Sequence, residues 1–383
     1  MTEYIKIGII DYMMLPVFLL YQKGGIMRRL LSNQLTPGMV VAQDVLSFDN
    51  QMILAKDTVL TDNIILKLNM YDVVFVNVHD KIVPVPIMDP HVSSYSERVR
   101  KSEDFQQFKE KYEDEVSSFK DMLNNVVERN ITLDVNALLQ ESLAIIKSTD
   151  GKTGVLDMLQ NMREYDDSTF AHSLNVGLIC NIFAGWLKLG EEETNMVTAC
   201  GLLHDIGKLM IPHHIIAKPG KLTDTEYESI KKHPQLGYHL LASQNTDTAI
   251  CNAALMHHER CDGTGYPLKL HREQLSGYSK IVSIADVYDA MTAARVYRGP
   301  LCPFHVIQVF EDEGIQKYDV GYILTFLENV ANTYIGNRCK LSDGREGTII
   351  FINKNNYSRP MVQCEDEYVN LAERKGMSVM YLL

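Results

Sequence analysis

Histidine and aspartate side chains that could bind metal ions are concentrated in the middle of the chain. Eight of the twelve histidines lie between residues 172 and 258. The adjacent pair His204-Asp205 follows an apolar run, where burial of two unpaired polar side chains would be costly. A metal ion removes that cost, because imidazole and carboxylate groups bind divalent ions and one carboxylate can bridge two of them. These residues therefore predict a metal centre.

A second adjacent pair, His257-His258, precedes a glycine-rich turn. Two neighbouring positions on a helix lie about 100° apart, so both rings can flank one ion. Lys208 follows Asp205 by three residues and would share its face on a continuing helix. A cation beside a pair of metal ions suits a phosphate group. Further candidate ligands are His172, His233 and Asp286.

Helical periodicity dominates the part of the chain that carries these residues. Residues 134–335 read as helical throughout, which predicts an all-α domain. Residues 27–85 favour a small α/β module, and residues 336–383 favour a small β-rich segment. Residues 86–133 combine a proline-containing linker with a connecting helix. The predicted fold class is mainly α, a helical bundle with a small N-terminal α/β module and a small C-terminal β-rich segment.

The terminal residues and the composition bear on the cellular location of the protein and on its partners. Residues 1–26 contain an apolar run too short for a membrane helix, which needs about 20 apolar residues. We interpret them as an extension in front of Met27 and expect no stable membrane span. Seven cysteines without a CxxC pair favour a reducing cytoplasm, and a net charge of -12 argues against a nucleic-acid polymer as partner. The N-terminal module and the connecting helix leave open a homodimer.

Taken together, the motifs resemble a known family. A first histidine is followed by His-Asp with Gly-Lys behind it, by His-Pro, by His-His-Glu with Asp-Gly-Thr-Gly-Tyr-Pro, and by Asp-Val-Tyr-Asp-Ala. This arrangement, over roughly residues 135–335, resembles the HD-GYP family of bacterial cyclic-di-GMP phosphodiesterases. The resemblance implies an HD-type helical bundle of the metal-dependent phosphohydrolase superfamily.

The resemblance also implies a role for individual residues. Two divalent ions, iron or manganese, would share Asp205, which would be catalytic together with Lys208, the residue that would hold a phosphoryl oxygen. Members with a third ion carry a glutamate where this chain has Ser168, so we expect two ions. The implied ligands are His172, His204, Asp205 and Asp286 for one ion, and Asp205, His233, His257 and His258 for the other. The implied substrate contacts are Asp166, Lys208, Tyr266, Asp289, Arg295 and Arg298.

The expected reaction is hydrolysis of cyclic-di-GMP to pGpG and, if the linear product rebinds, to GMP. A hydroxide bridging two ions would attack phosphorus, so no protein nucleophile is needed. Three alternatives stay open. The substrate could be another cyclic dinucleotide such as 3',3'-cGAMP, the protein could sense a cyclic dinucleotide or its metal state without turnover, or a carboxylate-bridged di-iron pair could switch activity by changing oxidation state.

Overall fold

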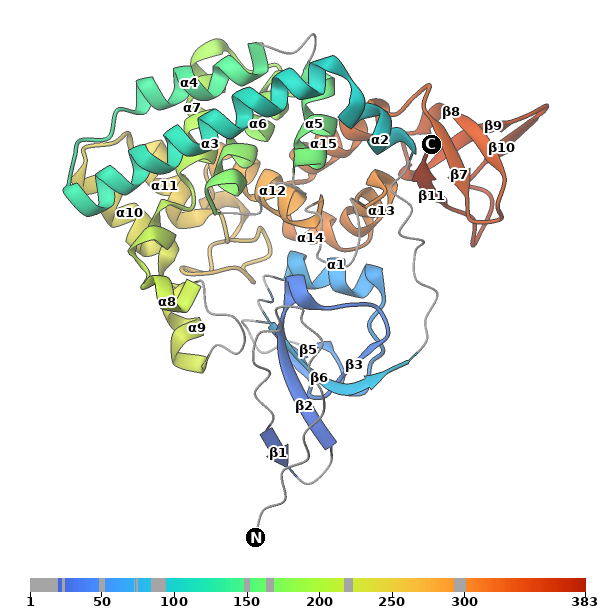
Figure 1. Cartoon of the computed structure of the whole chain (residues 1–383), viewed down its shortest axis with the longest axis horizontal. Coiled ribbons are helices and arrows are strands. Elements are labelled where there is room, and N and C mark those ends of the chain that lie inside the picture. Colours follow the sequence, from blue (N-terminus) through green and yellow to red (C-terminus); the bar gives the residue numbers. More distant parts are fainter. Residues whose placement is uncertain are drawn as a thin grey trace, which may run out of the picture.

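The computed structural model shows a large helical domain with a smaller module on one side and a sheet on another (Figure 1). It describes residues 20–22, 25–47, 52–71, 73, 75–83, 94–147, 152–162, 169–216, 223–292 and 301–383. Asp166, Ser168, Arg295 and Arg298 lie outside the described residues. The predicted fold class is confirmed, because helices form the bulk of the described chain between an N-terminal α/β module and a C-terminal sheet.

The N-terminal module is an antiparallel sheet covered by one helix. Thr61 caps that helix, since its hydroxyl accepts a hydrogen bond from the backbone N–H of Ile64 at 3.3 Å. Leu20 pairs with Met27, so the described residues in front of Met27 belong to this sheet. The sheet has the order β1 (Leu20–Gln22), β2 (Gly25–Leu31), β6 (Phe75–Ile82) and β3 (Met39–Val41), beside a β4 (Val45–Leu46) and β5 (Met52–Leu54) pair.

The helix of this module, α1 (Asp62–Met70), lies between the sheet and the helical domain (Figure 1). Its two faces enter two different cores. Ile65 and Leu68 pack with the sheet, whereas Leu66 and Met70 join the core of the helical domain. A helix that is apolar on two faces must be buried on both. The helix therefore fastens the module to the domain.

The helical domain begins with two helices where one connecting helix was expected. Ser102 separates them, because its hydroxyl accepts from the backbone N–H of Phe105 at 3.2 Å and so caps the second helix. The helices are α2 (Ser94–Lys101), α3 (Glu103–Arg129), α4 (Val135–Lys147), α5 (Lys152–Met162), α6 (Thr169–Trp186), α7 (Glu191–Leu203), α8 (His213–Ile216), α9 (Asp224–Ile230), α10 (His233–Ser243), α11 (Thr248–Met256), α12 (Gly277–Thr292), α13 (Pro303–Val309), α14 (Ile315–Lys317) and α15 (Val320–Asn332). Short 3-10 turns lie at Ser32–Gln34, Ile206–Met210 and Arg272–Gln274.

The C-terminal segment is a five-stranded antiparallel sheet that shares its core with the helical domain. Its buried residues Cys339 and Ile349 belong to the same apolar cluster as the helices. A π-helical turn at Phe310–Gly314 contributes Glu311, whose carboxylate accepts from the backbone N–H groups of Tyr357 and Ser358. The strand order is β10 (Glu367–Asn370), β9 (Asn356–Cys364), β8 (Glu346–Asn353), β7 (Arg338–Leu341) and β11 (Val379–Leu382).

Two observations concern the apolar helices and the cysteines. Within the described residues, no helix combines the length and the apolar character needed to cross a membrane. All seven cysteines are free and buried.

Candidate metal centre

His172, His204 and Asp286 form the first of two clusters of potential metal ligands. They come from the first turn of α6, from the residue after α7 and from the middle of α12. Helices α6 and α7 approach closely at a glycine pair, since a Cβ on Gly201 would lie 2.9 Å from the Cα of Gly177. The rings of His172 and His204 are consequently only 5.2 Å apart between centroids. His172 Nε2 also lies 3.0 Å from Asp286 Oδ1 on α12.

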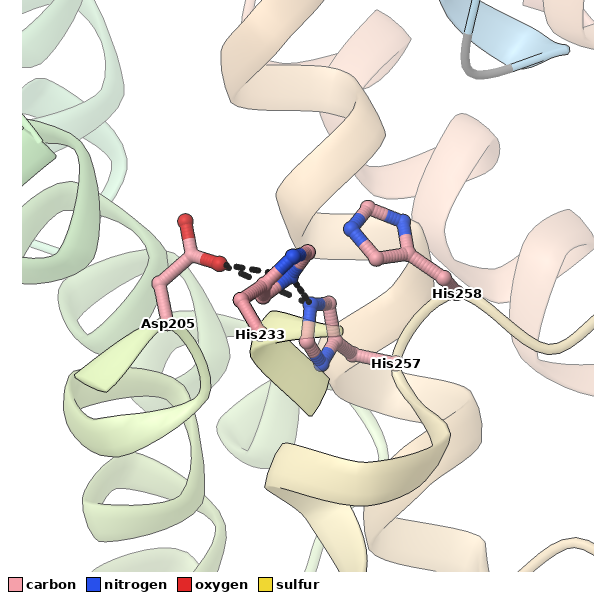
Figure 2. A group of neighbouring side chains, drawn as sticks. All are labelled: Asp205, His233, His257 and His258. Atoms are coloured by element: carbon pink, nitrogen blue, oxygen red, sulfur yellow. Dashed lines mark hydrogen bonds and ion pairs between the residues drawn. The ribbon is translucent and has the colours of Figure 1, made fainter. Parts of the chain in front are cut away.

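Asp205, His233, His257 and His258 form the second cluster (Figure 2). His233 begins α10, and the histidine pair directly follows α11. Asp205 Oδ1 lies 3.2 Å from His233 Nε2 and 3.6 Å from His257 Nε2. The ligand atoms within each cluster all lie within 4.8 Å of one another. The structure thus brings together all seven predicted metal ligands, in two groups.

Gly207 allows the two clusters to meet. No α-helix continues past Asp205: α7 ends at Leu203 and the chain enters a 3-10 turn at Ile206, in which Lys208 still lies beside Asp205. In that turn a Cβ on Gly207 would lie 2.0 Å from the carbonyl oxygen of His233. Only glycine permits this approach, and it places the start of α10 beside Asp205.

Backbone carbonyl groups orient three of the imidazole rings. The Nδ1 atoms of His204, His233 and His257 lie 2.7, 2.8 and 2.9 Å from the carbonyl oxygens of Gly201, Ile230 and Ala254. In each case the carbonyl belongs to the residue three positions earlier. A carbonyl oxygen can only accept, so each Nδ1 carries the proton and each Nε2 presents a lone pair towards the clusters. Such hydrogen bonds typically fix the tautomer of metal-binding histidines.

The lone pairs that converge here fit a cation. His233 Nε2 lies 3.1 Å from His257 Nε2, and two lone pairs at that distance repel unless a positive charge lies between them. His204 Nε2 is buried and makes no hydrogen bond. Burial lowers the pKa of His257 to about 4 and that of His258 well below its usual value, so both rings are neutral at neutral pH. Neutral imidazoles with carboxylates are a donor set suited to borderline divalent ions.

Asp205 faces both clusters. Its Oδ1 points to His233 and His257, whereas its Oδ2 lies 3.4 Å from His204 Nε2. Burial alone would raise the pKa of this carboxyl, but Lys208 and the histidines hold it well below its usual range. Lys208 Nζ lies 2.5 Å from Asp205 Oδ2. The lysine side chain keeps 27% of its surface exposed whereas that of Asp205 is fully buried, so Lys208 lies between the carboxylate and solvent.

Glu259 organises the glycine-rich turn after the histidine pair, a role that the sequence analysis missed. Glu259 is 1% exposed, and its carboxylate accepts hydrogen bonds from the backbone N–H groups of Leu268 at 2.6 Å and Leu270 at 2.9 Å. A Cβ on Gly265 would lie 2.4 Å from the Cα of Glu259, so the turn folds directly against this residue. An acidic residue beside two ligand histidines was the only sequence signal.

Two predicted substrate contacts have protein partners of their own. The ring of Tyr266 stacks on His258, with centroids 4.7 Å apart and planes at 18°. Asp289 Oδ2 lies 2.7 Å from His172 Nδ1, and its Oδ1 accepts from Asn175 at 3.1 Å. Asn175, which is fully buried, was not singled out in the sequence. The other predicted contacts are Lys208, beside Asp205, and Asp166, Arg295 and Arg298, which lie outside the described residues.

The segment that carries both ligand clusters matches a known protein family. A family model described as an HD domain matches residues 155–321. The chain is 34% identical over 194 residues to the cyclic di-GMP phosphodiesterase PA4108 of Pseudomonas aeruginosa, covering 50% of this chain and 46% of that protein. It is 39% identical over 145 residues to the 3'3'-cGAMP-specific phosphodiesterase 1 of Vibrio cholerae, covering 38% of this chain and 34% of that protein. The chain thus spans less than half the length of either relative.

Among solved structures, the chain is similar to Bd1817, an HDG"Y"P protein from Bdellovibrio bacteriovorus. That match has a TM-score of 0.46 and 15% sequence identity, and covers 79% of this chain and 99% of the other. The segment of this chain that matches the HD domain contains both ligand clusters and the His257-to-Pro267 signature. The HD-domain match over residues 155–321 and the similarity to cyclic di-GMP phosphodiesterases support the expected resemblance to the HD-GYP family.

Proposed function

We propose that this protein is a metal-dependent phosphodiesterase that hydrolyses cyclic-di-GMP. An HD domain implies binding of divalent metal, and the two ligand clusters fit two ions that share Asp205. The observation that carries the proposal is the placement of the two Asp205 oxygens, one towards each cluster. His172, His204 and Asp286 would complete one site, and the three histidines of the second cluster would complete the other.

The residues around the clusters would prepare a phosphodiester for hydrolysis. When bound, two divalent ions supply hydroxide at neutral pH and neutralise charge at phosphorus. Lys208 would then exchange its contact with Asp205 for one with a phosphoryl oxygen, which explains how a chain of net charge -12 accepts an anion. Iron or manganese as the metal, pGpG as first product and GMP as second product belong to this proposal, as do substrate contacts by Asp166, Arg295 and Arg298.

A product assay tests the proposal. Protein loaded anaerobically with iron(II) or with manganese is incubated with cyclic-di-GMP, and the nucleotides are separated by chromatography. We expect pGpG or GMP from the wild type and none from Asp205→Ala. The matched control is Asp121→Ala, which removes an exposed aspartate on α3 and should leave turnover unchanged. Absence of both products from wild type that holds two ions per chain would refute cyclic-di-GMP as substrate.

A second candidate substrate is 3',3'-cGAMP. The chain is 39% identical over 145 residues to a relative named for that specificity. Two relatives named for cyclic di-GMP are similar to the chain to the same degree, at 38% over 149 residues and 36% over 148 residues. Comparing kcat/KM for both nucleotides on the same preparation distinguishes the two. Tight binding of either nucleotide without any product would favour a sensor. A cytoplasmic location and a homodimer through the N-terminal module or α3 remain predictions, the latter open to sedimentation analysis.

A further inference from the structure

A buried hydroxyl group on α3 is unexplained by packing alone. Tyr112 is 1% exposed and lies on the apolar face of α3 that covers the helical domain. Phenylalanine would fill the same space without a polar atom, and a buried hydroxyl costs free energy unless it is hydrogen-bonded. The Tyr112 hydroxyl lies 2.6 Å from Asn175 Oδ1 and 3.2 Å from the carbonyl oxygen of Ala171. Both acceptors are on α6, close in sequence to His172.

From Tyr112 a chain of hydrogen bonds leads to the first cluster. Asn175 Nδ2 donates to Asp289 Oδ1 at 3.1 Å, and Asp289 Oδ2 lies 2.7 Å from His172 Nδ1. An ionised carboxylate can only accept, so the amide group of Asn175 must face Asp289 and its carbonyl must face Tyr112. With its Nδ1 proton held by Asp289, His172 directs the lone pair of Nε2 towards Asp286 and Asp205.

We propose that Tyr112 is a positioning residue for the metal ligand His172, acting through Asn175 and Asp289. The inference rests on the proposed pair of metal ions. Tyr112 lies outside residues 155–321, so α3 completes the metal centre from outside the segment that matches the HD domain. The hydroxyl fixes the orientation of the Asn175 amide, the amide fixes one carboxylate oxygen of Asp289, and the other oxygen fixes the ring of His172.

The test measures metal affinity, not turnover. Metal-free protein is titrated with Co²⁺ against a chelator, and the visible absorption of the bound ion reports its ligand geometry. Loss of a hydrogen-bonding partner behind a ligand typically weakens metal binding by about 10- to 100-fold. Two residues, Asn175 and Asp289, lie between Tyr112 and His172 in this chain of hydrogen bonds. We therefore expect Tyr112→Phe to weaken the binding of one of the two Co²⁺ ions by about tenfold. The other dissociation constant should not change.

The matched control is Tyr334→Phe. Tyr334 is also fully buried, and its hydroxyl donates to a carboxylate at 3.2 Å, that of Asp157, which is not among the ligands. This variant loses a comparable hydrogen bond, so it should lower the melting temperature without changing either Co²⁺ constant. Equal weakening of Co²⁺ binding in both variants would show a general loss of stability and overturn the proposal.

A double-mutant cycle tests the route. Asn175→Ala interrupts the chain of bonds at its centre, so adding Tyr112→Phe to it should cause no further weakening. The same fold-change in both backgrounds would overturn the route through Asn175, as would an unchanged Co²⁺ constant and spectrum in Tyr112→Phe. Wild type that binds no Co²⁺ at all would instead refute the metal centre itself. Circular dichroism of each variant establishes that it is folded.

Discussion

Removing the Glu259 carboxylate should release the glycine-rich turn that carries Tyr266. The carboxylate is the acceptor for the backbone N–H groups of Leu268 and Leu270. A hydrogen bond contributes about 1 kcal/mol to stability, and one to a charged group contributes up to about 3 kcal/mol. In Glu259→Ala both groups lose their acceptor, so the turn should open more easily by about 2–6 kcal/mol in total. Glu259→Gln keeps one acceptor oxygen and should lose about half of that.

Hydrogen exchange of the two amides measures this effect directly. A change of about 1–3 kcal/mol per amide corresponds to exchange that is roughly 5- to 150-fold faster. We expect faster exchange at both Leu268 and Leu270 in Glu259→Ala, but at only one of them in Glu259→Gln. Exchange in the middle of α6, far from this turn in sequence, should change little in either variant.

The matched control for Glu259 is Glu115→Ala. Glu115 is also buried, but its carboxylate accepts from the side-chain hydroxyl of Ser142, which can rotate towards another acceptor. The exchange of the turn amides should therefore stay at the wild-type rate in Glu115→Ala. Wild-type exchange at Leu268 and Leu270 in Glu259→Ala would refute the role assigned to the carboxylate.

Three further predictions concern stability, attachment of the N-terminal module and the meeting of the two clusters. Burial raises the pKa of Asp157 from 3.8 to about 6, so the folded state keeps a proton that the unfolded chain loses, and wild-type stability falls as pH rises through that window. Asp157→Asn should therefore gain about 1–3 kcal/mol over wild type between about pH 4 and pH 7 in denaturant titrations, and a pH-independent difference would contradict this. The Tyr71 hydroxyl, just after α1, donates a hydrogen bond to the Glu313 carboxylate at 2.7 Å. Glu313→Gln weakens this bond and should speed amide hydrogen exchange in α1 several-fold, with no change in α6. Gly207→Ala places a methyl group against the His233 carbonyl and should abolish binding of two metal ions per chain, whereas retention of both would disprove the close approach.

Sequence patterns did not indicate how the N-terminal module and the C-terminal sheet attach to the helical domain. The π-helical turn at Phe310–Gly314 uses Glu311 to bind backbone groups of the C-terminal sheet and Glu313 to bind Lys67 and Tyr71 of the N-terminal module. In the sequence, these acids are part of an unremarkable charged run. Their partners lie far away along the chain, so only the packing of helix against module and sheet could assign them.

Local sequence was sufficient for the ligand types and for most elements around them. Imidazole and carboxylate groups in an otherwise apolar helical region predict a metal centre, because their burial is costly without a cation. Thr61 likewise marks the start of α1 through a hydrogen bond that spans three residues. Such signals are readable because the interacting groups are neighbours in sequence, or because the chemistry of one side chain demands a partner of a known kind.

Tertiary structure alone decided how each group is used. Tyr112 lies on the apolar face of a helix, yet its hydroxyl reaches Asn175 on α6, and Asp289 lies within hydrogen-bonding distance of His172. The two oxygens of Asp205 face different clusters because Gly207 lets α10 approach the end of α7. A sequence specifies which atoms can donate or accept, but their direction depends on helices that meet only after the chain has packed.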